Sequence, residues 1–270
     1  MNDMFTAVSG AIAQERRLGR ITHNLANAHT SGFRRDTMRF VAESPDFAFQ
    51  DAWPGQVQNV DHSKAVLPSS AIAYPVLQPA ALDLTPGELS PTGDPLDLAI
   101  SSSDPAIGGN AFFELQSTQG KRLTRSSNFI IGLKNGEKML LASGSQLPVL
   151  GQGGHPVTLN SDSFEVTKDG GVWQDGKQIA RLKLVAVADT VQLRHVGENA
   201  LAYDGEEKEL HELELGETTV VLQGYEESSN VSVIDELMRM IQVQRNFDAM
   251  TKSIQTSDET RTRLITNAMS

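Results

Sequence analysis

Apolar residues recur at intervals of three and four near the start of the chain. Residues 3–28 contain no proline, and their apolar positions fall on one face of a helix. These positions are Met4, Phe5, Val8, Ala11, Ile12, Leu18, Ile21 and Leu25. The run Thr30-Ser31-Gly32 follows, and Gly32 can adopt the positive φ that ends a helix. The pattern predicts an amphipathic helix at the N-terminal end.

The other end predicts a longer helix. Residues 231–268 contain neither glycine nor proline, and apolar residues repeat there in heptads. One stripe comprises Val233, Met240, Val243, Phe247, Met250, Ile254 and Leu264, and a second comprises Ile234, Leu237, Met238 and Ile241. Apolar residues therefore occupy more than one face, and a single partner helix would not cover them.

The middle of the chain has the pattern of short strands and turns. Residues 33–225 hold all 11 prolines and all but three of the 22 glycines. Apolar runs at 111–115, 129–133 and 181–187 alternate with turn signals. Asn135-Gly136 between two apolar runs is a strong hairpin signal, and Asp-Gly dipeptides flank Val172-Trp173 in the same way. This region is predicted to be all-β.

Together these patterns predict an α+β fold. Residues 1–32 and 229–270 are expected to pair as a coiled-coil-like domain of N- and C-terminal helices. Residues 33–80 are expected to be an extended connector, and residues 81–228 a β-rich domain inserted between the helices.

Composition narrows the class of protein. The chain has 270 residues and a formal charge of −11, which argues against a nucleic-acid-binding protein. Residues 204–217 hold seven acids, which we interpret as a solvated loop or strand edge. The chain has no cysteine, so disulfides, thiolate nucleophiles and zinc–cysteine sites are excluded. No apolar run reaches bilayer length, and the N-terminal end lacks the apolar core of a cleaved signal peptide.

No pattern of catalytic residues stands out. The six histidines are scattered without metal-site spacing, and no G-x-S-x-G nucleophile motif occurs. We therefore expect no catalytic, cofactor-binding or metal site, no cofactor and no enzymatic activity. The basic run 121–125 is most simply a solvated face, and the alternative is a contact for an acidic patch on a partner.

Several motifs resemble the flagellar rod and hook family of axial proteins. They lie at 21–34 (ITHNLANAHTSGFR), 85–89 (TPGEL), 92–100 (TGDPLDLAI), 111–115, 123–129, 223–231 (QGYEESSNV), 240–247 and 252–259. Ser31 stands where the family commonly has proline, Ala111 where it has glycine, and residues 101–110 resemble a short insertion. The resemblance extends over essentially the whole chain, in order.

The resemblance implies a structural subunit of the bacterial flagellar basal-body rod. Such subunits polymerise helically, with themselves and with other rod proteins, into a hollow drive shaft that crosses the periplasm and encloses the export channel. They pass unfolded through the flagellar type III export apparatus without signal cleavage, and neither nucleic acid nor membrane insertion is involved. The motif at 181–185 most resembles the proximal-rod branch, and the distal-rod branch is the alternative. More remote alternatives are a β-rich binding or adhesive module and a cell-wall hydrolase.

The assembly interface is predicted from the helical stripes. Long helices without partners are marginal in water, so we expect the terminal helices to become ordered on assembly. The alternative is an intramolecular hairpin that is already folded. The predicted interface residues are Met4, Val8, Leu18, Leu25, Asn27, Ile234, Leu237, Met240, Ile241, Val243, Phe247, Met250, Ile254 and Leu264.

Overall fold

The computed structural model divides the chain into two compact units. It describes residues 2–43 and 74–269, apart from 106, 108, 119, 135, 189, 198 and 206–208. The first unit comprises Met1–His23, Met38–Ala80 and Ile234–Ser270, and is called here the helical unit. The second comprises Asn24–Thr37 and Ala81–Val233, and is called the β unit.

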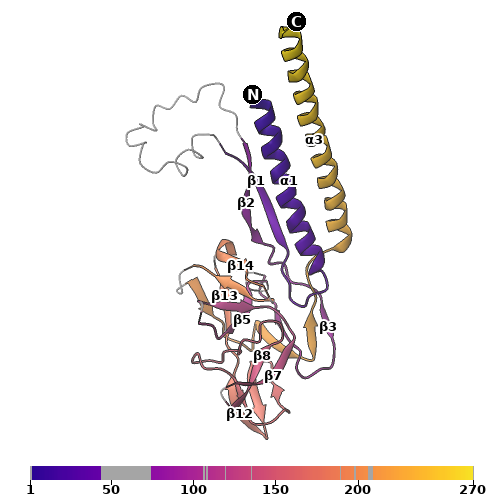
Figure 1. The fold of residues 1–270 in the computed structure, drawn as a ribbon. Helices are drawn as coiled ribbons and strands as arrows, with labels where there is room; N and C mark the ends of the chain where they lie inside the picture. Colours follow the sequence, from indigo (N-terminus) through magenta and orange to yellow (C-terminus); the bar gives the residue numbers. More distant parts are fainter. Residues whose placement is uncertain are drawn as a thin grey trace, which may run out of the picture. The chain divides into compact units, whose positions relative to one another are not determined.

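One long helix comes from each end of the chain (Figure 1). Helix α1 covers Asn2–Ala26 and helix α3 covers Val233–Met269, close to the ranges predicted from apolar periodicity. At 1.5 Å per residue the 37 residues of α3 extend about 55 Å. Strands β1 (Asp36–Glu43) and β2 (Tyr74–Leu82) form a two-stranded sheet. Most of the predicted connector at 33–80 lies outside the described residues.

The predicted coiled-coil pairing of the terminal helices is wrong. The structure is mostly β-strands with one helix at each end, and the described apolar stripes do not form a continuous buried seam. Val8 is 37% exposed, and Phe247 on α3 is 40% exposed. A close approach occurs between Gly10 and the Met250 side chain.

The sequence explains why a seam does not form. A coiled coil needs apolar residues at both heptad positions over several turns of both helices. The polar run at 14–17 interrupts the stripe on α1, and between Ile254 and Leu264 the chain of α3 is polar. The class α+β still describes the content, but the helical ends are not a coiled-coil domain.

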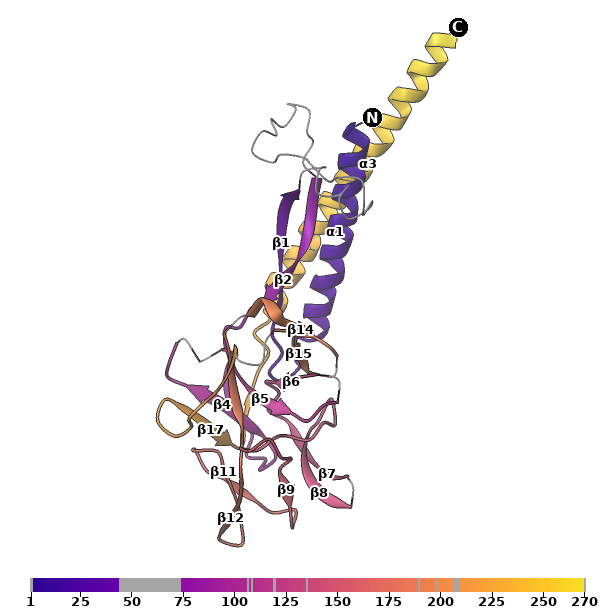
Figure 2. The ribbon, with the colours of Figure 1, turned by 90° about the vertical axis from the view of Figure 1, so that its left-hand side faces the viewer.

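The β unit contains short antiparallel strands. Their bounds are β3 (Leu89–Pro91), β4 (Leu98–Ser102), β5 (Ala111–Leu115), β6 (Arg122–Thr124), β7 (Phe129–Lys134), β8 (Glu137–Ala142), β9 (Thr158–Leu159), β10 (Glu165–Val166), β11 (Gly171–Gln174), β12 (Lys177–Arg181), β13 (Leu184–Val187), β14 (Leu193–His195), β15 (Leu201–Tyr203), β16 (Leu210–Glu212), β17 (Thr219–Gln223) and β18 (Tyr225–Glu227). The largest sheet has the order β14-β15-β6-β5-β13-β16, and several of these strands are labelled in Figure 2. Strand β17 pairs with β4, and β18 pairs with β3.

Both hairpins predicted from turn dipeptides are present. Strands β7 and β8 pair with Lys134 opposite Glu137, and β11 and β12 pair with Gln174 opposite Lys177. In the second hairpin Asp175 has φ 49° and Gly176 φ 73°, as a two-residue primed turn requires. The apolar run at 181–187 differs from the prediction because it is divided between the end of β12 and the whole of β13.

The six-stranded sheet is covered on both faces. Phe112 and Phe113 are adjacent in β5 and therefore point to opposite faces, and both are fully buried. Phe113 belongs to a core cluster with Leu98 and Leu184, and Phe112 to a second cluster with Leu123. This two-sided core fixes strands β5 and β6. Neither described helix has a stretch apolar enough to cross a bilayer.

Candidate functional site

The predicted interface residues fall into three groups by exposure. Val8, Ile234, Leu237, Ile241, Phe247 and Leu264 are exposed; Leu18, Leu25, Asn27, Met240, Met250 and Ile254 are half-buried; Val243 is buried. Met4 lies in α1, and its side chain is outside the described residues. The structure contains one chain, so which of these residues contact another subunit stays a prediction.

The start of α3 presents an apolar surface to solvent. Four large apolar side chains are exposed there: Ile234 by 72%, Leu237 by 43%, Met238 by 66% and Ile241 by 51%. Their spacing of three, four and seven residues places them on one face of the helix, called here the α3 apolar face. Large apolar side chains gathered in this way mark an interaction surface more often than isolated ones do.

Three buried charges meet within the β unit, and we call them the junction cluster. Glu227 on β18 accepts hydrogen bonds from Arg34 Nη2 at 2.7 Å and from Arg125 Nε at 2.6 Å. The three side chains are at most 1% exposed. Arg125 also donates to the carbonyl oxygens of Ala111 and Ile100, which ties the cluster to β5 and β4. The cluster thus joins residues 193 and 102 positions apart in the chain.

Backbone groups complete the surroundings of Glu227. The N–H of Gly87 donates to Glu227 Oε1 at 2.9 Å, and the N–H of Gly32 donates to the Glu227 carbonyl at 2.8 Å. Gly32 has the predicted positive φ, 64°, but it does not end the helix, because α1 already ends at Ala26. A Cβ on Gly32 would lie 2.2 Å from the Arg125 carbonyl oxygen. A Cβ on Gly87 would lie 1.9 Å from the Ser228 carbonyl oxygen. Only glycine fits these two close approaches.

Two asparagines fasten the neighbouring segments. Asn230 Oδ1 accepts from the N–H of Arg35 at 2.8 Å, and its Nδ2 donates to the carbonyl of Asp83 at 2.8 Å. Asn24 bonds both the N–H and the carbonyl of Asp36. Both amide side chains therefore form hydrogen bonds with backbone groups of the segment that follows α1, as a neighbouring strand would.

The cluster keeps its charges. Burial by itself would raise the pKa of Glu227, but Arg125 and Arg34 outweigh it and the pKa lies below its ordinary value. Burial lowers the pKa of Arg125 to about 10, against the opposing effect of Glu227. Glu227 and Arg125 are thus ionised near neutral pH, and the two arginines compensate the buried carboxylate.

The junction cluster was not predicted as a unit from the sequence. Each of its segments carries one of the motifs on which the family resemblance was based, at 21–34, 85–89, 92–100, 111–115, 123–129 and 223–231. The signal was available, because Arg34, Arg125 and Glu227 are charges within motifs that are otherwise rich in glycine, serine and apolar residues. What the motifs have in common is that they meet at one place in the fold.

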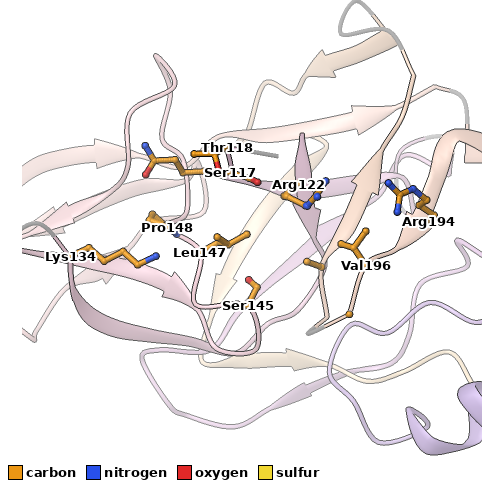
Figure 3. Close-up of a pocket in the computed structure, with 12 residues that line it drawn as sticks. Ser117, Thr118, Arg122, Lys134, Ser145, Leu147, Pro148, Arg194 and Val196 are labelled. Carbon is orange, nitrogen blue, oxygen red and sulfur yellow. The ribbon is translucent and has the colours of Figure 1, made fainter. Parts of the chain in front are cut away.

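A separate cavity of about 910 Å³ opens in the β unit (Figure 3). Its lining includes Arg122, Lys134 and Arg194, and the other described residues that line it are uncharged; we call it the basic cleft. Among the described residues, no group of three or more His, Asp or Glu side chains is placed to hold a metal ion.

Known proteins resemble this chain over nearly its full length. The family model described as the C-terminal part of the flagellar basal-body rod FlgEFG proteins matches residues 222–267. The flagellar basal-body rod proteins FlgG of two Buchnera aphidicola subspecies, from Schizaphis graminum and Acyrthosiphon pisum, are 31% and 30% identical, with 95% of each chain covered. The chain belongs to the flagellar basal-body rod protein family. The rod protein FlgF of Rhizobium meliloti is 29% identical over 94% of this chain and 92% of its own.

This rod protein is a structural subunit of the flagellar basal body, and membership implies assembly with other basal-body proteins. Relatives named FlgF and FlgG match at similar identity, so identity does not separate the two branches. The matched range 222–267 contains Glu227, Asn230 and most of α3. The family model thus spans a part of the junction cluster and the α3 apolar face.

Proposed function

We propose that this rod protein polymerises helically by covering the α3 apolar face with neighbouring subunits. The single observation that carries the proposal is the exposure of Ile234, Leu237, Met238 and Ile241 on one face of α3. Burying such side chains stabilises by about 1.5–3 kcal/mol each, which offsets the entropy lost on association. The predicted interface residues Met240, Phe247 and Ile254 lie on another face of α3, so more than one neighbour can be engaged.

The polymer is proposed to form the hollow periplasmic shaft that transmits torque and encloses the export channel. The subunit would reach it unfolded through the flagellar type III export apparatus, without cleavage of a signal peptide. The absence of cysteine supports this route, because an unfolded chain without thiols cannot be trapped by disulfides in an oxidising compartment. We place the chain in the proximal branch on the basis of its 181–185 motif.

A pair of neighbouring substitutions tests the proposal. Ile241→Asp puts a charge on the α3 apolar face, where burial of an unpaired carboxylate costs several kcal/mol. Gln242→Asp adds the same charge at an exposed polar position about 100° around the helix. Introduced into the strain that encodes the chain, Ile241→Asp is expected to abolish rod assembly and swimming.

The matched variant Gln242→Asp is expected to swim normally. Both purified variants should unfold like the original chain, because position 241 is exposed in the free subunit. Normal swimming by Ile241→Asp, with the variant present in isolated basal bodies, would contradict the proposal.

A further inference from the structure

The basic cleft combines three cations with otherwise uncharged described lining residues, on a chain of net charge −11. Arg122 comes from β6, Lys134 from the end of β7, and Arg194 from the edge strand β14. The other lining residues are Gln116, Ser117, Thr118, Ser145, Leu147, Pro148, Val196, Gly197 and Ala200. Figure 3 shows Lys134 and Arg194 at opposite ends of the group, with Arg122 between them.

Among the described residues, two of the three cations form no direct ion pair with a carboxylate. Lys134 Nζ donates to the carbonyl of Gln146 at 2.8 Å, and Arg122 Nη1 donates to the carbonyl of Lys121 at 3.3 Å. A backbone carbonyl accepts a hydrogen bond but does not neutralise a cation. Arg194 forms an ion pair with Asp204, which lowers the pKa of that exposed carboxyl, with Arg122 contributing at longer range. Arg194 is therefore already paired, and Lys134 and Arg122 are the cleft cations that can take carboxylates from outside.

The opposite edge of the same sheet carries acids. Glu212 ends the edge strand β16, and Glu214 and Glu217 follow in the loop; all three are exposed, and together we call them the acidic strip. The loop is anchored, since Leu213 N–H donates to the Leu184 carbonyl at 2.9 Å and Leu215 packs against the core. These contacts hold the acidic strip facing outward.

A chain cannot place its own acidic strip in its own basic cleft. Arg122 lies on β6, and three strand spacings, about 14 Å, separate β6 from the edge strand β16 in the six-stranded sheet. The anchored loop does not cross that distance. The complementary surfaces on one copy can instead meet those of another copy.

We propose that the basic cleft receives the acidic strip of a second copy of this chain, with Lys134 and Arg122 pairing with the strip's carboxylates. The contact joins different surfaces of the two copies, so it can repeat from copy to copy, as a helical rod requires, and does not end in a two-fold dimer. The inference rests on the proposed function, because it specifies a lateral contact within the assembled rod. Burial of the α3 apolar face stabilises the association, and the paired charges fix the register of neighbouring subunits.

The absence of cysteine gives a direct test. Gln116→Cys in the cleft and Thr218→Cys beside the acidic strip leave every charge of both surfaces in place. Isolated basal bodies of the double variant are treated with a short bismaleimide crosslinker. The expected product is a ladder of dimers and higher oligomers of this chain. Each single variant is expected to give only monomer, and a strain expressing both single variants only dimer.

Two controls fix the interpretation. Replacing Gln116→Cys by Gln178→Cys on β12, an exposed position outside the cleft lining, is expected to give no ladder. Adding Lys134→Glu to the double variant is expected to reduce the crosslinked fraction at least tenfold, whereas Lys177→Glu at an exposed position leaves it unchanged.

The outcomes separate this contact from the proposed function. Basal bodies that contain the double variant but yield no ladder would overturn the contact and leave the rod function standing. Crosslinking of the thiol introduced by Gln116→Cys to a different protein would also overturn it. Absence of the original chain from basal bodies would contradict the proposed function itself.

Discussion

Glu227 is a buried carboxylate held between two arginines from distant parts of the chain. Arg34 follows α1, Arg125 follows β6, and the Gly87 N–H provides a further donor to the same carboxylate. A buried charge of this kind is stable only while its partners stay in place, because an unpaired ion in the protein interior is costly. The junction cluster therefore makes the meeting of three segments a condition for folding of the β unit.

Replacing Glu227 by glutamine removes the one anion of the junction cluster. Glu227→Gln leaves Arg34 and Arg125 buried together without compensation, so the free energy of unfolding is expected to fall by about 3–5 kcal/mol. Glu226→Gln, one residue away and half-buried, is expected to change it by less than about 0.5 kcal/mol. Urea unfolding followed by circular dichroism measures both, and equal stability of the two variants would contradict the assignment.

The lowered pKa of Glu227 predicts how the stability of the folded chain changes in acid. The pKa of Glu227 is lowered in the folded state from an ordinary value of 4.5, so its stabilising contribution is fully present above about pH 4.5. The contribution is lost as the pH falls through the folded pKa, because the unfolded chain then binds the proton more readily. Glu227→Gln should therefore lose less stability between pH 5 and pH 3 than the original chain, by titration of urea midpoints. An identical slope would show that Glu227 is not paired.

Gly32 combines a positive φ with a close backbone approach. Gly32→Ala forces a Cβ within 2.2 Å of the Arg125 carbonyl oxygen, and we expect a loss of roughly 3 kcal/mol or more in the free energy of unfolding. Gly93→Ala is the matched control, because Gly93 also has a positive φ but open space around it. That control should lose about 1 kcal/mol. Comparable losses in the two variants would mean that the close approach at Gly32 is relieved at no cost.

At the scale of elements, apolar periodicity and turn-forming dipeptides predicted the features that depend on residues close together in the sequence. The two helices and the hairpins at 134–137 and 174–177 follow from the spacing of apolar residues and from glycine at positive φ. The coiled-coil prediction was wrong because a coiled coil requires the apolar stripes of α1 and α3 to match, and polar runs interrupt both stripes. The run at 181–187 was divided because Leu182 and Lys183 bond to Gly170 and Leu150 instead of continuing a ladder.

Helix α3 should open more readily toward its C-terminal end than the strands do. Most described side chains after Ile254 are exposed, so little tertiary contact protects that part of the helix in the free subunit. Hydrogen exchange on the purified chain is expected to be fast over residues 255–267 and slow in β5 and β13. Strong, even protection along the whole of α3 would favour a helical end that is already stable before assembly.

At the scale of the whole molecule, the candidate interaction surfaces are the α3 apolar face, the basic cleft and the acidic strip, and the junction cluster is buried. The motifs at 21–34 and 223–231 were recognisable in the sequence, but their convergence on Glu227 was not, since the partners lie 193 and 102 residues away. The basic run at 121–125 raised the alternative of an acidic partner. In the structure only Arg122 of that run joins the cleft lining, whereas Arg125 is buried in the junction cluster. Tertiary contacts assigned these two arginines their different roles.

The proposed function requires that rod assembly covers the α3 apolar face. A cryo-electron microscopy map of basal bodies isolated from the strain that encodes this chain tests it most directly. We predict that this chain is found in the rod with Ile234, Leu237 and Ile241, which are 43–72% exposed in the free subunit, buried against neighbouring subunits. A rod in which this chain is present and these side chains still face solvent would contradict the claim.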